Sequence, residues 1–165
     1  MRTFKSLAGA IDKAAGRALR GISIFLIALL FLLLIGNVVF RLVPVVSFGW
    51  FDEIVELCFA YLVFFGAAAL WREKEHFYID WLPKKFAKSK LGVPLCVIIE
   101  IVGLGFFLTL FWFGLGLTLR VDDQSPIFRL PRKLFYACVP TTALIMALYS
   151  VRNIVEWLRR PTACP

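Results

Sequence analysis

Four long runs of apolar residues dominate the sequence and limit what the chain can fold into. Residues 22–40 and 134–151 contain no charged side chain, and residues 54–71 and 91–119 contain one acid each. A helix needs about 20 apolar residues to cross a bilayer. Lipid offers the backbone no hydrogen-bond partners, and the runs are continuous rather than short and alternating. We therefore predict an all-α integral membrane protein with four transmembrane helices.

The composition excludes most other classes of protein. Of the 165 residues, 61% are hydrophobic and 18% are charged, whereas soluble domains are roughly 45–50% apolar and roughly 25% charged. So few charges cannot cover the surface of a small soluble domain. The net charge of +8 would indicate nucleic-acid binding in a soluble protein, but in a membrane protein it is read first as a signal of orientation. No nucleic-acid partner is predicted.

The basic residues are divided unevenly among the segments outside the predicted helices. Segments 1–21, 72–90 and 152–165 hold 14 of the 19 Lys and Arg residues. Basic residues stay on the cytoplasmic side of a membrane. Both termini are therefore predicted to be cytoplasmic, and the loops 42–53 and 120–133 are predicted to face outward.

Two of the basic segments also contain apolar residues in a pattern that favours the membrane surface. In segment 1–21 the apolar side chains recur near one face of a helix, which is typical of an amphipathic helix at the interface. A disordered basic leader is the alternative. Segment 72–90 mixes aromatic and basic residues and is predicted to form a second interfacial helix. Run 91–119 would be about 43 Å long, so it either tilts strongly or begins in the interface.

The residues that most catalytic or redox sites require are missing from the sequence. The chain has one histidine, His76, and its four cysteines form no C-x-x-C pair. No nucleotide-binding glycine motif is present. We predict no enzyme activity, no cofactor and no metal site, and a membrane-embedded enzyme or redox protein is the least favoured alternative.

Acids in or beside the apolar runs are the remaining candidates for polar function. Asp52, Glu53 and Glu56 lie at the start of the second run, where the N-terminus of a helix favours negative charge. Glu100 lies inside the third run, and an acid at such a depth normally faces protein. We favour intramembrane structural or partner contacts for Glu56 and Glu100. The alternative function is a self-sufficient homodimeric carrier coupled to protons through Glu100 or Glu56.

Glycines predict where helices approach closely. Gly103 and Gly105 recur as Gly114 and Gly116 eleven residues later, or about three helical turns, which places the two pairs on one face. Gly66 begins a short run of small residues near the end of the second apolar run. Small residues allow close packing in membranes, so these glycines are predicted to pack against helices of this chain or of a partner.

A group of residues between positions 48 and 82 carries a resemblance to a known family. It consists of a tryptophan followed by an acid, a Gly-Ala run, and then an arginine, a histidine and an aspartate. These residues are Trp50, Glu53, Gly66, Arg72, His76 and Asp80. Together with the length and the four-helix layout, they resemble the small membrane subunit (Q subunit) of tripartite ATP-independent periplasmic (TRAP) transporters.

The resemblance implies a transport function without catalysis. It implies a large membrane subunit that carries the substrate and sodium sites and moves like an elevator, and a periplasmic substrate-binding protein that docks transiently. The small subunit would sit among the lipids of a bacterial inner membrane as a multi-pass protein. It would form a stable heterodimer on the scaffold of the large subunit. The substrate would be an organic acid such as a C4-dicarboxylate or sialic acid.

Residues in the two predicted outer loops, 42–53 and 120–133, are the expected contacts with these partners. They are Trp50, Asp52, Glu53 and Arg129.

Overall fold

The computed structural model describes residues 2–41, 49–73 and 92–159. In this part of the chain every regular element is a helix. The helices are α1 (Arg2–Arg41), α2 (Gly49–Glu73), α4 (Gly92–Arg120), α5 (Lys133–Tyr136) and α6 (Cys138–Arg159). The structure has four helices long and apolar enough to cross a membrane. This confirms the predicted fold class, an all-α integral membrane protein with four transmembrane helices.

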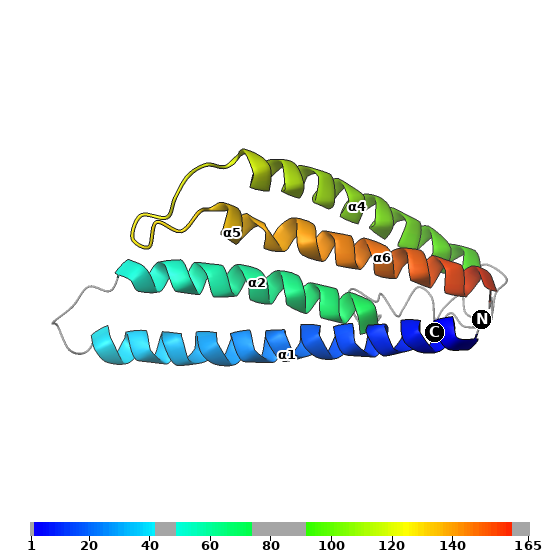
Figure 1. The fold of residues 1–165 in the computed structure, drawn as a ribbon, viewed down its shortest axis with the longest axis horizontal. Helices are drawn as coiled ribbons and strands as arrows, with labels where there is room; N and C mark the ends of the chain where they lie inside the picture. Colours follow the sequence, from blue (N-terminus) through cyan, green and yellow to red (C-terminus); the bar gives the residue numbers. More distant parts are fainter. Residues whose placement is uncertain (1, 42–48, 74–91, 160–165) are drawn as a thin grey trace.

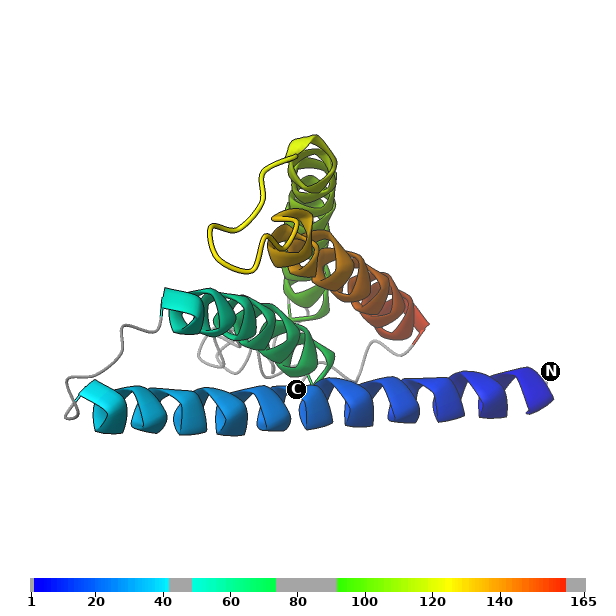
Figure 2. The same ribbon diagram turned by 60° about the vertical axis from the view of Figure 1, so that its left-hand side comes forward.

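The four long helices lie side by side in a row (Figure 1). Their order across the row is α1, α2, α6, α4. Figure 2 shows that the row is twisted, with α4 inclined steeply to α1. Among the described helices, α1 packs along α2, α4 packs along α6, and α2 and α6 join the two pairs. The chain therefore forms an open layer, and α1 and α4 are its two edges.

Helix α6 is the most enclosed of the four. In its most apolar stretch 44% of the residues are buried, compared with 6% in α1. Many of its buried side chains are small, which lets α2 and α4 approach on either side. The hydroxyl of Thr142 donates a hydrogen bond to the Cys138 carbonyl (2.6 Å), so this buried polar group is satisfied inside the helix. The buried residues of α6 include Cys138, Thr142, Ala143, Met146, Ala147, Ser150, Asn153 and Trp157.

One small core cluster brings all four long helices together. It consists of Leu19, Ala68, Phe107, Met146 and Ala147. Trp71 packs edge-on against Phe107, with 4.7 Å between ring centroids. The indole N–H of Trp71 also donates a hydrogen bond to the Ser150 hydroxyl (2.9 Å). In lipid, where apolar surroundings are everywhere, close packing and such interhelical hydrogen bonds hold helices together.

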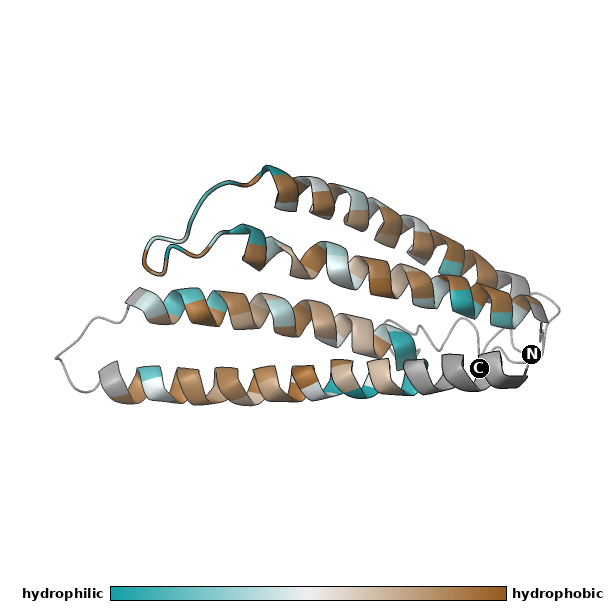
Figure 3. Ribbon diagram, viewed as in Figure 1, coloured by the Kyte–Doolittle hydropathy of each residue, from teal (hydrophilic) through white to brown (hydrophobic). Residues whose placement is uncertain are grey.

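The described parts of the two edge helices consist mainly of hydrophobic residues (Figure 3). Phe25 and Phe31 of α1 are 66% and 64% exposed, and Trp112 and Phe113 of α4 are 74% and 71% exposed. Hydrophilic residues gather toward the ends of the helices and in the loop that precedes α5. An apolar surface of this extent would promote aggregation in water, but it suits hydrocarbon and membrane partners.

Several helix bounds differ from the apolar runs that predicted them. Helix α1 continues without a break through the predicted segments 1–21 and 22–40, because no proline interrupts residues 2–41. Helix α6 likewise continues past the predicted end at residue 151 to Arg159. At its start, the predicted span 134–151 is divided into α5 and α6. Pro140 has no N–H to donate to the carbonyl four residues earlier, which weakens the helix there.

Some predictions stay predictions. The N-terminal end of α1 and the C-terminal end of α6 lie at the same end of the row (Figure 1), but their cytoplasmic location is an expectation from charge. The interfacial position of segment 1–21 is likewise an expectation. The predicted interfacial helix at 72–90 lies almost entirely outside the described residues.

Candidate functional site

The loop between α4 and α5 is held to the start of α2 by one carboxylate. One oxygen of Glu53 accepts hydrogen bonds from the Ser125 hydroxyl (2.7 Å) and the Phe128 N–H (3.1 Å). The other accepts from the Ile127 N–H (2.8 Å). Glu53 is only 8% exposed. A single buried side chain therefore fixes the position of this loop, residues 121–132, which we name the outer loop.

Hydrogen bonds within the outer loop close its base. The Ser125 N–H donates to the Leu130 carbonyl (2.8 Å), and the Arg132 N–H donates to the Asp123 carbonyl (2.9 Å). At the turn, Arg129 has a φ of 50°, which non-glycine residues adopt at a cost of about 1–2 kcal/mol. Such a conformation persists where its surroundings determine it, and here the bonds to Glu53 and across the base do so.

The tip of the outer loop presents apolar and cationic side chains outward. Ile127 and Phe128 are 51% and 45% exposed, and Arg129 is also exposed. Trp50, at the start of α2, contacts Phe128 edge-on with 6.5 Å between ring centroids. Asp52 is exposed nearby in the same turn of α2. An aromatic and apolar centre with charges around it is the usual composition of a protein-binding surface.

The end of the outer loop has two further contacts. The hydroxyl of Tyr61 on α2 donates a hydrogen bond to the Leu134 carbonyl (3.0 Å). Lys133 forms an ion pair with Asp122 (2.8 Å). The hydrogen bond from Lys133 and its positive charge lower the pKa of the Asp122 carboxyl. The Asp122 side chain is 88% exposed, so this pair contributes little to stability.

The structure places the two predicted intramembrane acids far apart. Glu56 is exposed on α2, near the end that carries the outer loop. Glu100 is 5% exposed and lies in the first third of α4, away from the end of that helix that leads into the outer loop. There its carboxylate accepts a hydrogen bond from the side-chain amide of Asn153 on α6 (2.8 Å). Glu100 therefore joins α4 to α6.

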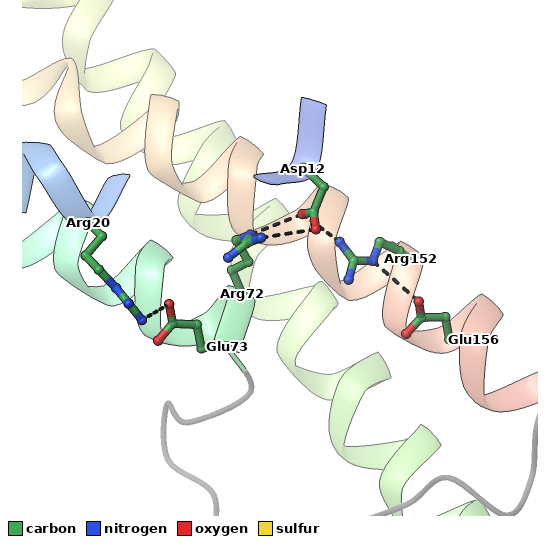
Figure 4. A network of polar contacts seen from close by, with 6 residues as sticks. All are labelled: Asp12, Arg20, Arg72, Glu73, Arg152 and Glu156. Atoms are coloured by element: carbon green, nitrogen blue, oxygen red, sulfur yellow. Dashed lines mark hydrogen bonds and ion pairs between the residues drawn. The ribbon is translucent and has the colours of Figure 1, made fainter. Parts of the chain in front are cut away.

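A second polar cluster joins three helices at the end of the row opposite the outer loop (Figure 4). The guanidinium of Arg72 on α2 donates two hydrogen bonds to Asp12 on α1, each 3.1 Å long. Arg152 on α6 donates a third to the same carboxylate (2.7 Å). Ion pairs between Arg20 and Glu73 and between Arg152 and Glu156 flank this centre. We name these residues the Asp12 clasp: Asp12, Arg20, Arg72, Glu73, Arg152 and Glu156.

Gly16 makes room for the Asp12 clasp. It lies one turn after Asp12 and is buried, and a Cβ added to it would overlap the guanidinium of Arg72. Neither Asp12 nor Gly16 was predicted from the sequence as a site residue. The signal that could have found them is a lone acid followed four residues later by glycine in an otherwise basic helix.

Three further residues of the family motif are Arg72, His76 and Asp80. Arg72 is in the Asp12 clasp, whereas His76 and Asp80 lie outside the described residues. Within the described residues no group of three His, Cys, Asp or Glu side chains is arranged to hold a metal ion.

The predicted packing glycines have two kinds of surroundings. A Cβ added to Gly103 would lie 3.1 Å from the ring of Trp71, and one added to Gly114 would lie 2.9 Å from Val139. These two glycines therefore adjoin neighbouring helices. A two-residue step turns an α-helix by about 200°, so the other glycine of each pair points elsewhere. The glycines whose added Cβ would meet nothing within 4 Å include Gly66, Gly105 and Gly116.

The comparison with protein families fits this architecture of apolar helices, an ordered outer loop and a polar clasp. A model of the DctQ component of tripartite ATP-independent periplasmic transporters matches residues 18–160. The chain belongs to the DctQ family. This confirms the resemblance carried by residues 48–82. A search of curated proteins gives no significant match.

Membership of the DctQ family identifies the kind of complex in which the outer loop and the clasp are found. A DctQ protein is the small permease subunit of a transporter with three components. Its partners are therefore a large membrane subunit and a substrate-binding protein. The match includes all of the outer loop and Arg72, and it begins six residues after Asp12.

Proposed function

We propose that this DctQ protein is the non-catalytic small subunit of a sodium-coupled transporter that imports an organic acid, such as a C4-dicarboxylate or sialic acid, across a bacterial inner membrane. In this proposal the large subunit carries the substrate and sodium sites and performs the elevator movement. The observation that carries it is the open row of helices. A solute path needs polar groups shielded from lipid, and the described helices present mainly apolar side chains on both edges of the row.

The exposed side of α4 supports contact with the scaffold of the large subunit. Gly105, Thr109, Trp112 and Gly116 are spaced by four, three and four residues, so they share one helix face. Small residues on such a face let another helix approach its backbone. Trp112 lies about 12 Å from the end of α4 at Arg120, at a depth where lipid offers its indole N–H no acceptor. A helix of the large subunit would supply one.

The outer loop supports docking of the substrate-binding protein. In this proposal Trp50, Asp52 and Arg129 touch the partner, and Glu53 is a positioning residue that holds the loop in the docking shape. Exposed apolar side chains beside Arg129 fit a partner surface that combines apolar residues with carboxylates. Opposite charges of this kind speed association and select the correct partner.

Co-purification with the large subunit tests the first part of the proposal. The substitutions Gly105→Leu and Gly116→Leu enter open space in this chain, so its own fold is retained. We expect each to reduce the amount of co-purified large subunit at least tenfold, because a leucine keeps the partner helix away from the α4 backbone.

Gly21→Leu on α1 is a matched control, since it also enters open space. We expect Gly21→Leu to leave the complex intact. Undiminished assembly of both α4 variants would contradict the placement of the large subunit on this face.

Reconstitution in liposomes tests which of the three components are required for uptake. Sodium-driven uptake of the organic acid is expected only when this chain, the large subunit and the binding protein are all present. Uptake by this chain alone, driven by a proton gradient, would instead establish the alternative carrier with Glu100 or Glu56 as its coupling acid.

A further inference from the structure

Three basic residues form a ladder on an exposed side of α1. Lys13, Arg17 and Arg20 are spaced by four and three residues, which places them within about 60° around the helix and over about 10 Å of its length. All three are exposed. Arg20 pairs with Glu73, but among the described side chains no carboxylate forms an ion pair with Lys13 or Arg17. The ladder therefore carries positive charge that the described part of the chain does not neutralise.

The same side of α1 continues beyond the ladder as an apolar surface. Ile24, Ile27 and Phe31 follow at helical spacing and are 60%, 57% and 64% exposed. Their spacing of three and four residues keeps them in line with Arg20 along the helix. One continuous strip thus changes from cationic to apolar within a single turn.

The change from cationic to apolar coincides with the edge of the hydrocarbon. The charge-free stretch 22–40 is about 29 Å long as a helix, close to the ~30 Å thickness of a bilayer core. When this stretch fills the core, Arg20 and Arg17 lie about 3 Å and 8 Å beyond its edge. The headgroup layer is roughly 5–7 Å thick on each side. By the positions of their Cα atoms, Arg20 therefore lies within the headgroup layer and Arg17 lies at its outer boundary, whereas Lys13, about 14 Å beyond the edge of the core, lies outside this layer.

We propose that this strip binds an anionic phospholipid. The ladder holds the phosphate, and an acyl chain lies along the apolar surface that follows it. Guanidinium groups suit this task because their donors match phosphate oxygens in pairs. The negative charge of the headgroup complements Lys13 and Arg17, which form no ion pair with a carboxylate among the described side chains.

The Asp12 clasp keeps the strip in place. Asp12 binds Arg72 and Arg152, and Gly16 lies against the guanidinium of Arg72. These contacts hold the first part of α1 beside α2 and α6, with the ladder on a different side of the helix. Arg72 and Arg152 share the Asp12 carboxylate, and Arg20 pairs with Glu73. Lys13 and Arg17 are therefore the ladder cations that remain available for a phosphate.

A helix of the large subunit is the less suitable occupant of this strip. Close packing between membrane helices uses small residues. The central positions of this strip are bulky, namely Ile24, Ile27 and Phe31, whereas the exposed side of α4 offers Gly105 and Gly116. Fluid acyl chains adapt to a bulky surface, which favours lipid here.

Native mass spectrometry of the assembled transporter, titrated with phosphatidylglycerol or phosphatidylcholine, tests the lipid site. We expect the wild-type complex to bind phosphatidylglycerol more tightly than phosphatidylcholine. The double variant Lys13→Gln/Arg17→Gln should bind phosphatidylglycerol about 30-fold more weakly, which corresponds to about 1 kcal/mol for each cation removed. The charge-conserving control Lys13→Arg/Arg17→Lys should bind it as the wild type does. Equal binding by the wild type and the Gln variant would overturn the proposal.

A photo-crosslinking amino acid at position 24 identifies the occupant directly. The expected product in membranes is a crosslink to phospholipid. A crosslink to the large subunit would overturn the proposal and assign the strip to protein. Neither readout measures uptake or docking, so a failure of the proposed transport function would leave the lipid result unchanged.

Discussion

The two ends of the helix row use charged residues in opposite ways. At one end the Asp12 clasp places two arginines on one carboxylate and thereby joins α1, α2 and α6. At the other end Glu53 accepts hydrogen bonds from a hydroxyl and two backbone N–H groups of the outer loop. The first carboxylate fixes helices against each other, and the second fixes the shape of a loop.

The Asp12 clasp stabilises the row of helices, whereas in the proposed function the outer loop recognises a partner. The clasp is a set of ion pairs, two of whose three main side chains are less than one-third exposed, and its loss would loosen the row. The outer loop is held to α2 through Glu53, and its tip exposes Ile127, Phe128 and Arg129. Four substitutions test whether this separation holds, from the largest expected effect to the smallest.

Glu53→Ala should have the largest effect. It removes all three hydrogen bonds and leaves the N–H groups of Ile127 and Phe128 without this acceptor. Since a hydrogen bond to a charged group contributes about 1.5–3 kcal/mol, we expect the ordered form of the outer loop to lose about 3–5 kcal/mol. Hydrogen exchange at these two amides should accelerate at least 100-fold. Glu56→Ala, at an exposed position one turn further along α2, is the control, and equal exchange in the two variants would contradict the role of Glu53.

Asp12→Ala should have a moderate effect on the stability of the row. It leaves Arg72 and Arg152 without their shared carboxylate, and we expect the free energy of unfolding to fall by about 2 kcal/mol. Thermal unfolding in detergent measures this loss. Glu73→Gln breaks only the more exposed pair with Arg20 and should cost less than 1 kcal/mol. If Asp12→Ala also disordered the outer loop, the two ends would not be separable.

Glu100→Gln should have a small effect on transport. The glutamine side chain retains an oxygen that accepts the hydrogen bond from Asn153, so α4 and α6 stay joined and uptake should remain within about twofold of the wild type. Glu100→Leu removes that acceptor and should destabilise the helix pair by about 1–2 kcal/mol. Loss of uptake in an assembled, stable Glu100→Gln complex would contradict a purely structural role.

Asp122→Asn should have the smallest effect. The pKa of Asp122 is lowered by Lys133, so the ion pair stabilises the fold above the ordinary carboxyl pKa of about 4 and is lost as the pH falls through the lowered value. The side chain is almost fully exposed, so salt weakens the pair. We expect no measurable change in thermal stability at pH 7 and a slightly flatter stability profile below about pH 4 in the variant. A change of several degrees at pH 7 would show that this pair shapes the outer loop.

The sequence predicted the helices well because each apolar run is a local property of the chain. The number of spans and the fold class follow from length and hydropathy, and the structure confirms both. The bounds were less accurate. Glycine and charged residues in α1 and α6 ended the apolar runs but did not end the helices, because none of them removes a backbone hydrogen bond as proline does.

The polar contacts were less accessible to prediction, because their partners are distant in the sequence. Glu53 and Ser125 are 72 positions apart, and Asp12 and Arg152 are 140 apart. An acid at a helix N-terminus already has a local explanation, which gave no reason to connect Glu53 to a particular loop. The order of helices across the row was also inaccessible, since a surface that faces lipid and one that faces a partner helix are both apolar.

The arrangement of the row in neighbouring pairs has a consequence for how the protein folds. Helices α1 and α2 are consecutive in the chain and pack together, and so do α4 and α6 around the short α5. Each hairpin can therefore form from nearby residues as it enters the membrane, a topology that favours rapid folding. The contact between α2 and α6 forms only when both hairpins are present, and Arg72 and Arg152 then meet at Asp12. Asp12 and Arg72 belong to the first hairpin, so the bond from Arg152 to Asp12 is the part of the clasp that reports the docking of one hairpin on the other.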